Sequence, residues 1–97
     1  MVKILAVCGM GLGSSFIVEM VTEEVIRELG IEADISHTTV SDAASIKTDI
    51  IITSTNFSET LNAYSTGAKI IALHKLTDKQ EIKEKLFPVL MELGYIK

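Results

Sequence analysis

Four short apolar runs constrain the fold of this chain more than any other feature. They cover residues 2–7, 31–36, 49–53 and 68–73, and they are rich in β-branched residues. Three of the four runs are continuous rather than alternating, which is typical of parallel strands that are covered on both faces. The sequence therefore predicts a sheet of four parallel strands.

The segments between the runs carry helical signals. Residues 14–29 place apolar side chains on one stripe and charged side chains on the opposite one, and Gly30 follows as a stop. A short helix is expected over residues 58–65, ended by Gly67. A single helical turn is expected over residues 41–46.

The last helix has a marked beginning and an interruption. Gln80 stands three residues after Thr77, a capping-box spacing that predicts a helix beginning at Thr77. Pro88 removes one backbone hydrogen bond inside that helix, so we expect a kink or a break near Phe87. The apolar positions that this helix is expected to bury are Ile82, Leu86, Phe87, Leu90 and Leu93.

Strands alternating with helices through short connections favour right-handed crossovers and a three-layer, Rossmann-like α/β fold. We expect an open sheet of four parallel strands in the order 2-1-3-4, with helices on both faces. The chain has 97 residues, of which 47% are hydrophobic, so residues 1–97 are expected to form a single domain. The first strand is then central, and its C-terminal end lies at the topological switch point of the sheet.

Charge and cysteine content exclude several classes of function. Nine basic and thirteen acidic residues give a formal net charge of −4, the wrong sign for a protein that holds nucleic acid through its phosphates. Cys8 is the single cysteine, so we expect a free thiol and no Cys-clustered zinc or iron–sulfur site. No metal and no cofactor are expected. No stretch approaches the roughly 18 apolar residues of a membrane helix. The opening run is too short for a signal peptide, so a cytoplasmic protein is expected.

A glycine-rich segment joins the first run to the first helix. It reads Cys8-Gly9-Met10-Gly11-Leu12-Gly13-Ser14-Ser15. Alternating glycines allow successive N–H groups to turn inward as an anion nest, and the helix directs its N-terminus at the same point. The same dipoles stabilise a thiolate, so Cys8 is a candidate nucleophile towards a bound phosphoryl group, with the Ser14 or Ser15 hydroxyl as an added donor. A buried cysteine beside a tight turn is the structural alternative.

Other glycine-loop families do not fit this spacing. A dinucleotide fingerprint would need glycine at Ser14 or Phe16, and a nucleotide P-loop would need a Gly-Lys-Ser/Thr ending. Low-molecular-weight cysteine phosphatases and arsenate reductases need arginine in place of Ser14. A loop that accepts phosphate on sulfur without the groups for hydrolysis predicts a phosphoryl carrier. A cysteine phosphatase-like enzyme and a non-catalytic anion-binding regulatory module remain as alternatives.

Residues 4–15 and 49–55 together resemble a known family, the soluble IIB components of the bacterial phosphoenolpyruvate-dependent phosphotransferase system (PTS). The ascorbate branch is the most similar and the galactitol branch the next. The resemblance implies that Cys8 takes a phosphoryl group from a phosphohistidine on a IIA partner. It further implies transfer to a substrate, L-ascorbate in that branch, imported by a membrane IIC partner. Residues 9–15 match the phosphate loop of the family position by position.

The resemblance implies no role for either histidine. His37 and His74 lie near the C-terminal ends of the second and fourth runs, and we expect them to be solvated or bonded to a loop carbonyl, with a proton relay as the alternative. The acidic residues of the first helix are likewise expected to form a solvated face. They are Glu19, Glu23, Glu24 and Glu28.

Two further groups are candidates for contacts around the loop. Ser54, Thr55 and Asn56 follow the third run, beside the first strand in the expected order, and are candidates to steady the phosphate loop. Turn and cap chemistry explains such a cluster equally well. Met10 and Leu12 are large apolar residues inside the glycine segment, and we expect one of them to project towards a partner.

Overall fold

The computed structural model describes residues 2–8, 12–43, 45–55, 57, 59, 67–74 and 78–95, and for residues 8, 12–16, 40 and 41 it describes the backbone alone.

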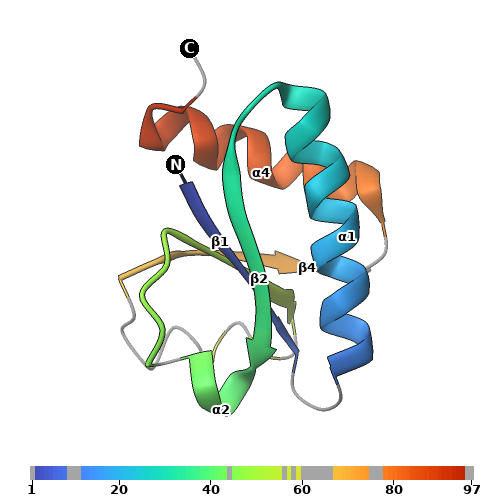
Figure 1. The fold of residues 1–97 in the computed structure, drawn as a ribbon, viewed down its shortest axis with the longest axis vertical. Coiled ribbons are helices and arrows are strands. Elements are labelled where there is room, and N and C mark those ends of the chain that lie inside the picture. Colours follow the sequence, from blue (N-terminus) through green and yellow to red (C-terminus); the bar gives the residue numbers. More distant parts are fainter. Residues whose placement is uncertain are drawn as a thin grey trace.

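Four parallel strands form one sheet in the order β2-β1-β3-β4, as predicted (Figure 1). Their bounds are β1 Val2–Cys8, β2 Ala33–Thr39, β3 Ile50–Ser54 and β4 Lys69–Leu73. The expected fold class is confirmed. The predicted bounds of the second strand were wrong, because β2 ends in His37, Thr38 and Thr39. Threonine favours strands through its branched side chain, a preference that a search for apolar runs does not detect.

The first helix is longer than predicted. Helix α1 spans Leu12–Leu29, so it begins two residues before the expected start, and Gly30 follows it with a φ of 71°. Helix α2, Val40–Ala43, supplies the expected helical turn after the second strand. The helix expected over residues 58–65 falls mostly outside the described residues. In that region the described residues Thr55, Phe57 and Glu59 are helical.

Helix α4 spans Lys79–Leu93, and its cap corrects the prediction of Thr77. The Asp78 carboxylate accepts hydrogen bonds from the N–H groups of Gln80 and Glu81, because an anionic oxygen both satisfies these donors and faces the positive end of the helix dipole. The expected break at Pro88 does not occur, since α4 is one helix through that residue. Pro88 and Glu84, whose carbonyl loses its helical donor, are both exposed, so water can satisfy that carbonyl.

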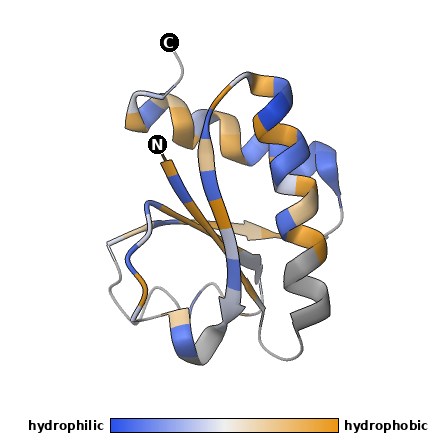
Figure 2. Cartoon of the chain, viewed as in Figure 1, coloured by the Kyte–Doolittle hydropathy of each residue, from blue (hydrophilic) through white to orange (hydrophobic). Residues whose placement is uncertain are grey.

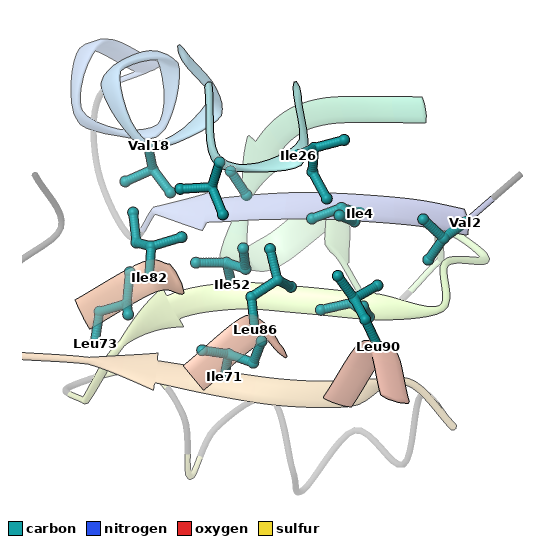
Figure 3. Packing of buried hydrophobic residues seen from close by; sticks show 13 residues of the cluster. Val2, Ile4, Val18, Ile26, Ile52, Ile71, Leu73, Ile82, Leu86 and Leu90 are labelled. Atoms are coloured by element: carbon teal, nitrogen blue, oxygen red, sulfur yellow. The ribbon is translucent and has the colours of Figure 1, made fainter. Parts of the chain in front are cut away.

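The main hydrophobic core lies between the sheet and both long helices (Figure 3). Alternate residues of a strand face opposite sides of a sheet, so one set from the strands meets α1 and α4. This set comprises Val2, Ile4, Ala6, Ile50, Ile52, Ile71 and Leu73. The helices contribute Val18, Val25 and Ile26 from α1, and Ile82, Leu86 and Leu90 from α4.

The opposite face of the sheet carries a smaller core. Leu5, Val7 and Ile51 pack there with Ala43 of α2. Helices therefore cover both faces, as predicted, with α1 and α4 on the same one. Along the described part of α1, hydrophobic and hydrophilic residues alternate (Figure 2), as expected for a helix that packs one side on the sheet. Burial of β1 on both faces fixes the position of its C-terminal end, where Cys8 stands.

Candidate functional site

Cys8 is the last residue of β1, the strand that lies between β2 and β3. Its Cα partner across the β1–β2 pair is Thr39, the last residue of β2. Helix α1 begins at Leu12, so only three residues separate the end of the central strand from the first turn of that helix. The first N–H groups of a helix have no partner within it and attract anions. The backbone thus places the N-terminus of α1 three residues beyond the end of the central strand in the sequence.

The start of α1 changes the interpretation of the glycine segment. Gly13, Ser14 and Ser15 belong to the first turn of α1 rather than to the connecting loop. Their N–H groups are therefore among those that a helix leaves free at its N-terminus. Gly9, Met10 and Gly11 lie outside the described residues, as do the side chains of Cys8, Leu12, Ser14 and Ser15.

The third strand ends beside the first, as the predicted order requires. Thr53 is fully buried, and its hydroxyl donates to the carbonyl of Val7 at 3.1 Å. Continuing the register of β1 and β3, in which Ala6 pairs with Ile52, brings Ser54 level with Cys8. The Ser54 Oγ is buried and has no hydrogen-bond partner among the described residues.

The two other candidates, Thr55 and Asn56, follow the third strand in the sequence. Thr55 is exposed and helical, and Asn56 lies outside the described residues. The expected contact of Thr55 and Asn56 with the loop therefore stays a prediction. The same holds for Met10 and Leu12 as partner contacts. Among the described side chains of the first half of α1, the exposed apolar ones are Ile17 and Met20, at 44% and 49% exposure.

His37 is paired with a carboxylate of α1. Its Nδ1 contacts the Glu19 Oε2 of α1, which joins β2 to α1 on the face that carries the main core. The two side chains are only 31% and 20% exposed. The expectation of a solvated Glu19 is therefore wrong. Sequence periodicity could not find this pair, because it depends on the register of β2 and the rotation of α1.

His74 also bonds a carboxylate, at the end of β4. Its Nδ1 and its backbone N–H both lie 2.9 Å from the Glu81 Oε2. The Lys85 Nζ contacts the same oxygen at 2.8 Å and donates to the Ala72 carbonyl at 2.6 Å. The imidazole of His74 is 78% exposed, unlike that of His37. Because β3 separates β4 from β1, this cluster is remote from the end of the central strand.

The rest of the acidic stripe lies towards the far end of α1. Lys79 contacts the carboxylates of Glu24, at 3.6 Å, and Glu28. The hydrogen bond from Lys79 holds the pKa of Glu28 below its ordinary value, and the same bond raises the pKa of Lys79. These residues tie α4 to α1 and take no part in the site at Cys8.

Two hollows lined by described residues lie away from the C-terminal ends of the strands. One, of about 430 Å³, lies between α1 and the start of β2, and the other, of about 360 Å³, lies around Lys3 and Asp49. Within the described parts of the chain no group of three metal-ligating side chains is found. No described helix is both long enough and apolar enough to cross a membrane.

Comparison with known proteins supports a single family. The family described as PTS system, lactose/cellobiose-specific IIB subunit, matches residues 3–87 of this chain. A protein of Mycoplasma pneumoniae, described as an ascorbate-specific PTS system EIIB component, is 33% identical over 89 residues. That alignment covers 90% of this chain and 93% of the relative.

A solved structure supports the same fold. The lactose-specific IIB component domain from Streptococcus pneumoniae superposes with a TM-score of 0.66, covering 99% of this chain and 98% of that domain. The sequence identity is 15%, so this likeness concerns the fold alone.

Proposed function

This chain belongs to the IIB family of PTS subunits, the phosphoryl-transfer components of that system, and we propose that Cys8 is the residue on which it carries the phosphoryl group. The observation that carries the proposal is the position of Cys8. It ends the central strand of the sheet, and three residues separate it from the free N–H groups at the start of α1. A helix N-terminus favours both a thiolate and a phosphoryl dianion at that place.

The reaction forms and breaks one bond in each of two steps. In the first, the Cys8 thiol loses its proton and the thiolate attacks the phosphorus of a phosphohistidine on a IIA partner. The N–P bond breaks as the S–P bond forms, and the histidine nitrogen retains the electron pair and takes up a proton in place of the one that the thiol lost. In the second, a substrate hydroxyl oxygen attacks the phosphorus and releases its proton to solvent, the S–P bond breaks and the thiolate is regenerated.

The chain needs only to position and stabilise the charge that moves in these steps, since phosphoryl transfer depends mainly on geometry and electrostatics. The backbone N–H groups of Gly13, Ser14 and Ser15 are available for this in the first turn of α1. Residues 9–15 contain no arginine or lysine. Neutral donors stabilise a phosphoryl dianion less strongly than a guanidinium, which suits a carrier that must also release the group.

We infer that L-ascorbate is the substrate that receives the phosphoryl group. The support is the M. pneumoniae relative, whose description is ascorbate-specific and which aligns over 90% of this chain. The family as a whole is described for lactose and cellobiose, so those sugars are the substrates to compare. In this proposal residues 1–97 act as one cytoplasmic IIB domain between a IIA donor and a membrane IIC partner.

Intact mass spectrometry tests the phosphoryl step. We expect one added phosphoryl group when the chain is incubated with a phosphohistidine-bearing IIA protein of the ascorbate type. The group should be absent from Cys8→Ala, which removes the single thiol of the chain. His74→Gln is the matched control and should still be labelled, because the proposal places the phosphoryl group on sulfur and not on an imidazole. Labelling of Cys8→Ala would refute the assignment.

The fate of the label tests the carrier role. Discharge should require membranes that contain the ascorbate-type IIC partner together with ascorbate, and lactose or cellobiose should not replace ascorbate. Rapid release of inorganic phosphate without that partner would indicate a cysteine phosphatase instead. Failure to label the wild-type chain, with the IIA donor shown to be active on another IIB protein, would indicate an anion-binding module.

A further inference from the structure

We propose that the His37–Glu19 pair sets the charge next to Cys8, so that both side chains act as positioning residues for the phosphoryl group. The proposal starts from the contact between the His37 Nδ1 and the Glu19 Oε2, which are carried by β2 and α1. It rests on the proposed function of Cys8 for its consequence in phosphoryl transfer, whereas the electrostatic coupling can be tested without that function.

The sheet register brings the pair close to Cys8. His37 is the Cα partner of Ala6, and Cys8 is the Cα partner of Thr39. A displacement of two residues along the strand and one strand across corresponds to about 8 Å between the Cα atoms of His37 and Cys8. Glu19 lies about two turns after the start of α1, the helix that follows the phosphate loop.

The pair is also shielded from water. The side chains of His37 and Glu19 are 31% and 20% exposed, so solvent screens their charges less than it screens a fully exposed pair. Loss of the imidazole would leave the Glu19 carboxylate half-buried without its His37 contact. A carboxylate charge beside His37 that has lost this contact opposes both the thiolate and the phosphoryl dianion at Cys8.

Few other charges of the described residues on α1 and α2 lie near the end of β1. Cys8 is the only titratable side chain in residues 4–18, so the other residues of the phosphate loop carry no charge. On α1 the next charged residues, Glu23, Glu24 and Arg27, are exposed and lie farther from the loop. On α2, Asp42 accepts a hydrogen bond from the Thr39 hydroxyl at 3.3 Å and is exposed.

The remaining charges on neighbouring strands are placed elsewhere. On β2, Asp34 lies on the opposite face from His37, because their positions differ by an odd number of residues. On β1, Lys3 lies near the start of the strand, five residues before Cys8. Among the described residues of β1, β2, α1 and α2, the His37–Glu19 contact therefore combines proximity to the end of β1 with partial burial.

The pH profile of Cys8 alkylation by iodoacetamide measures the coupling directly, because only the thiolate reacts. The midpoint of the profile should rise by about half a unit to one unit in His37→Leu, which leaves the Glu19 carboxylate without its imidazole. The double variant His37→Leu/Glu19→Gln removes that carboxylate, so its midpoint should return towards the wild-type value. A purely structural role would give both variants the same profile.

The pair of His74 and Glu81 provides a matched control. It has the same chemistry at the end of β4, with β3 between it and β1, so His74→Leu/Glu81→Gln should leave the midpoint unchanged. Circular dichroism establishes that each variant is folded. If His37→Leu does not fold, His37→Gln is compared with His37→Gln/Glu19→Gln, where loss of the carboxylate must lower the midpoint.

Two results would overturn the proposal: a His37→Leu midpoint equal to that of the folded wild type, or a double variant that keeps the full shift.

The consequence for phosphoryl transfer is measured separately. At equilibrium with a phosphorylated IIA donor, the ratio of phosphorylated to free His37→Leu should fall by about threefold to tenfold relative to wild type. If the wild-type chain accepts no phosphoryl group at all, the proposed function fails while the alkylation profiles still decide the coupling.

Discussion

The hydroxyl of Thr53 donates a hydrogen bond to the backbone carbonyl of Val7, 3.1 Å away, and so ties β3 to β1 one residue before Cys8. Thr53 is fully buried. A buried hydrogen bond of this kind does two things. It satisfies polar groups that water cannot reach, and it fixes the end of the central strand against its neighbour.

We therefore expect Thr53→Val to lower the free energy of unfolding by about 1 kcal/mol, the usual net contribution of such a bond. Urea denaturation measures this change. The rate of phosphoryl uptake from the IIA donor should also fall, by a few-fold, because the end of β1 is less well fixed.

Thr48→Val is the matched control for Thr53→Val. The Thr48 hydroxyl contacts the Lys3 carbonyl at 2.9 Å, so it bonds the same strand at the opposite end. Its substitution should change stability without slowing phosphoryl uptake. Equal rates for the wild type and Thr53→Val would show that this bond does not position Cys8.

The cap of α4 gives a second prediction. The Asp78 Oδ1 accepts from the Gln80 N–H at 3.0 Å and from the Glu81 N–H at 3.3 Å. Asp78→Ala leaves both donors without this acceptor and should cost about 1 kcal/mol in the free energy of unfolding. Asp78→Asn, which keeps a capping oxygen, should cost much less. If the two variants unfold at the same urea concentration, the cap is not stabilising.

Pro88 gives a third prediction, in which the substitution raises the free energy of unfolding. It lies inside a continuous α4 and is exposed. Pro88→Ala restores an N–H donor for the Glu84 carbonyl, and proline costs about 3 kcal/mol relative to alanine inside a helix. Pro88→Ala also makes the unfolded chain more flexible, which reduces this gain in stability by up to about 1 kcal/mol. The net gain of about 2 kcal/mol should appear as a higher urea midpoint, and an unchanged or lower midpoint would contradict it.

The fold followed from the sequence because its determinants are local. Each strand is marked by an apolar run that can be recognised without knowing its neighbours, and short connections then leave few topologies. Two of the missed boundaries show the limit of such local patterns. The end of β2 is polar at His37 and Thr39, and the cap of α4 is Asp78, one residue beyond the capping-box pattern.

The candidate site also combines features that are local in the sequence with one that is not. Cys8 and the glycine segment are contiguous in the chain, so their chemistry could be inferred directly from the residues. The His37–Glu19 contact joins residues 18 positions apart. Predicting it requires both the register of β2 against β1 and the rotation of α1 over the sheet, and neither is encoded in a local pattern.

The last prediction concerns pH and the ion pair between the two long helices. Lys79, the first residue of α4, contacts the Glu28 carboxylate of α1. The hydrogen bond from Lys79 lowers the pKa of Glu28, and the bond to Glu28 raises the pKa of Lys79. A carboxyl group with a lowered pKa in the folded state stabilises the fold above its ordinary pKa of about 4.3, and this contribution is lost as the pH falls through the lowered value.

The lysine acts at the other end of the pH scale. Its raised pKa means that its contribution is present at neutral pH and is lost only as the pH rises through that raised value. Between the two limits the pair should contribute a constant amount. Because both side chains are exposed, added salt should reduce that amount.

Glu28→Gln should therefore be less stable than the wild type at pH 7 in low salt, and the difference should disappear as the pH is lowered towards 3. Urea denaturation at each pH measures it. Glu23→Gln is the control, since Glu23 is exposed on the same helix and forms no ion pair with any described residue. A wild-type advantage over Glu28→Gln that stays the same from pH 7 to pH 3 would mean that the carboxylate charge is not its source. The advantage would then come from the packing of α4 on α1, which does not titrate.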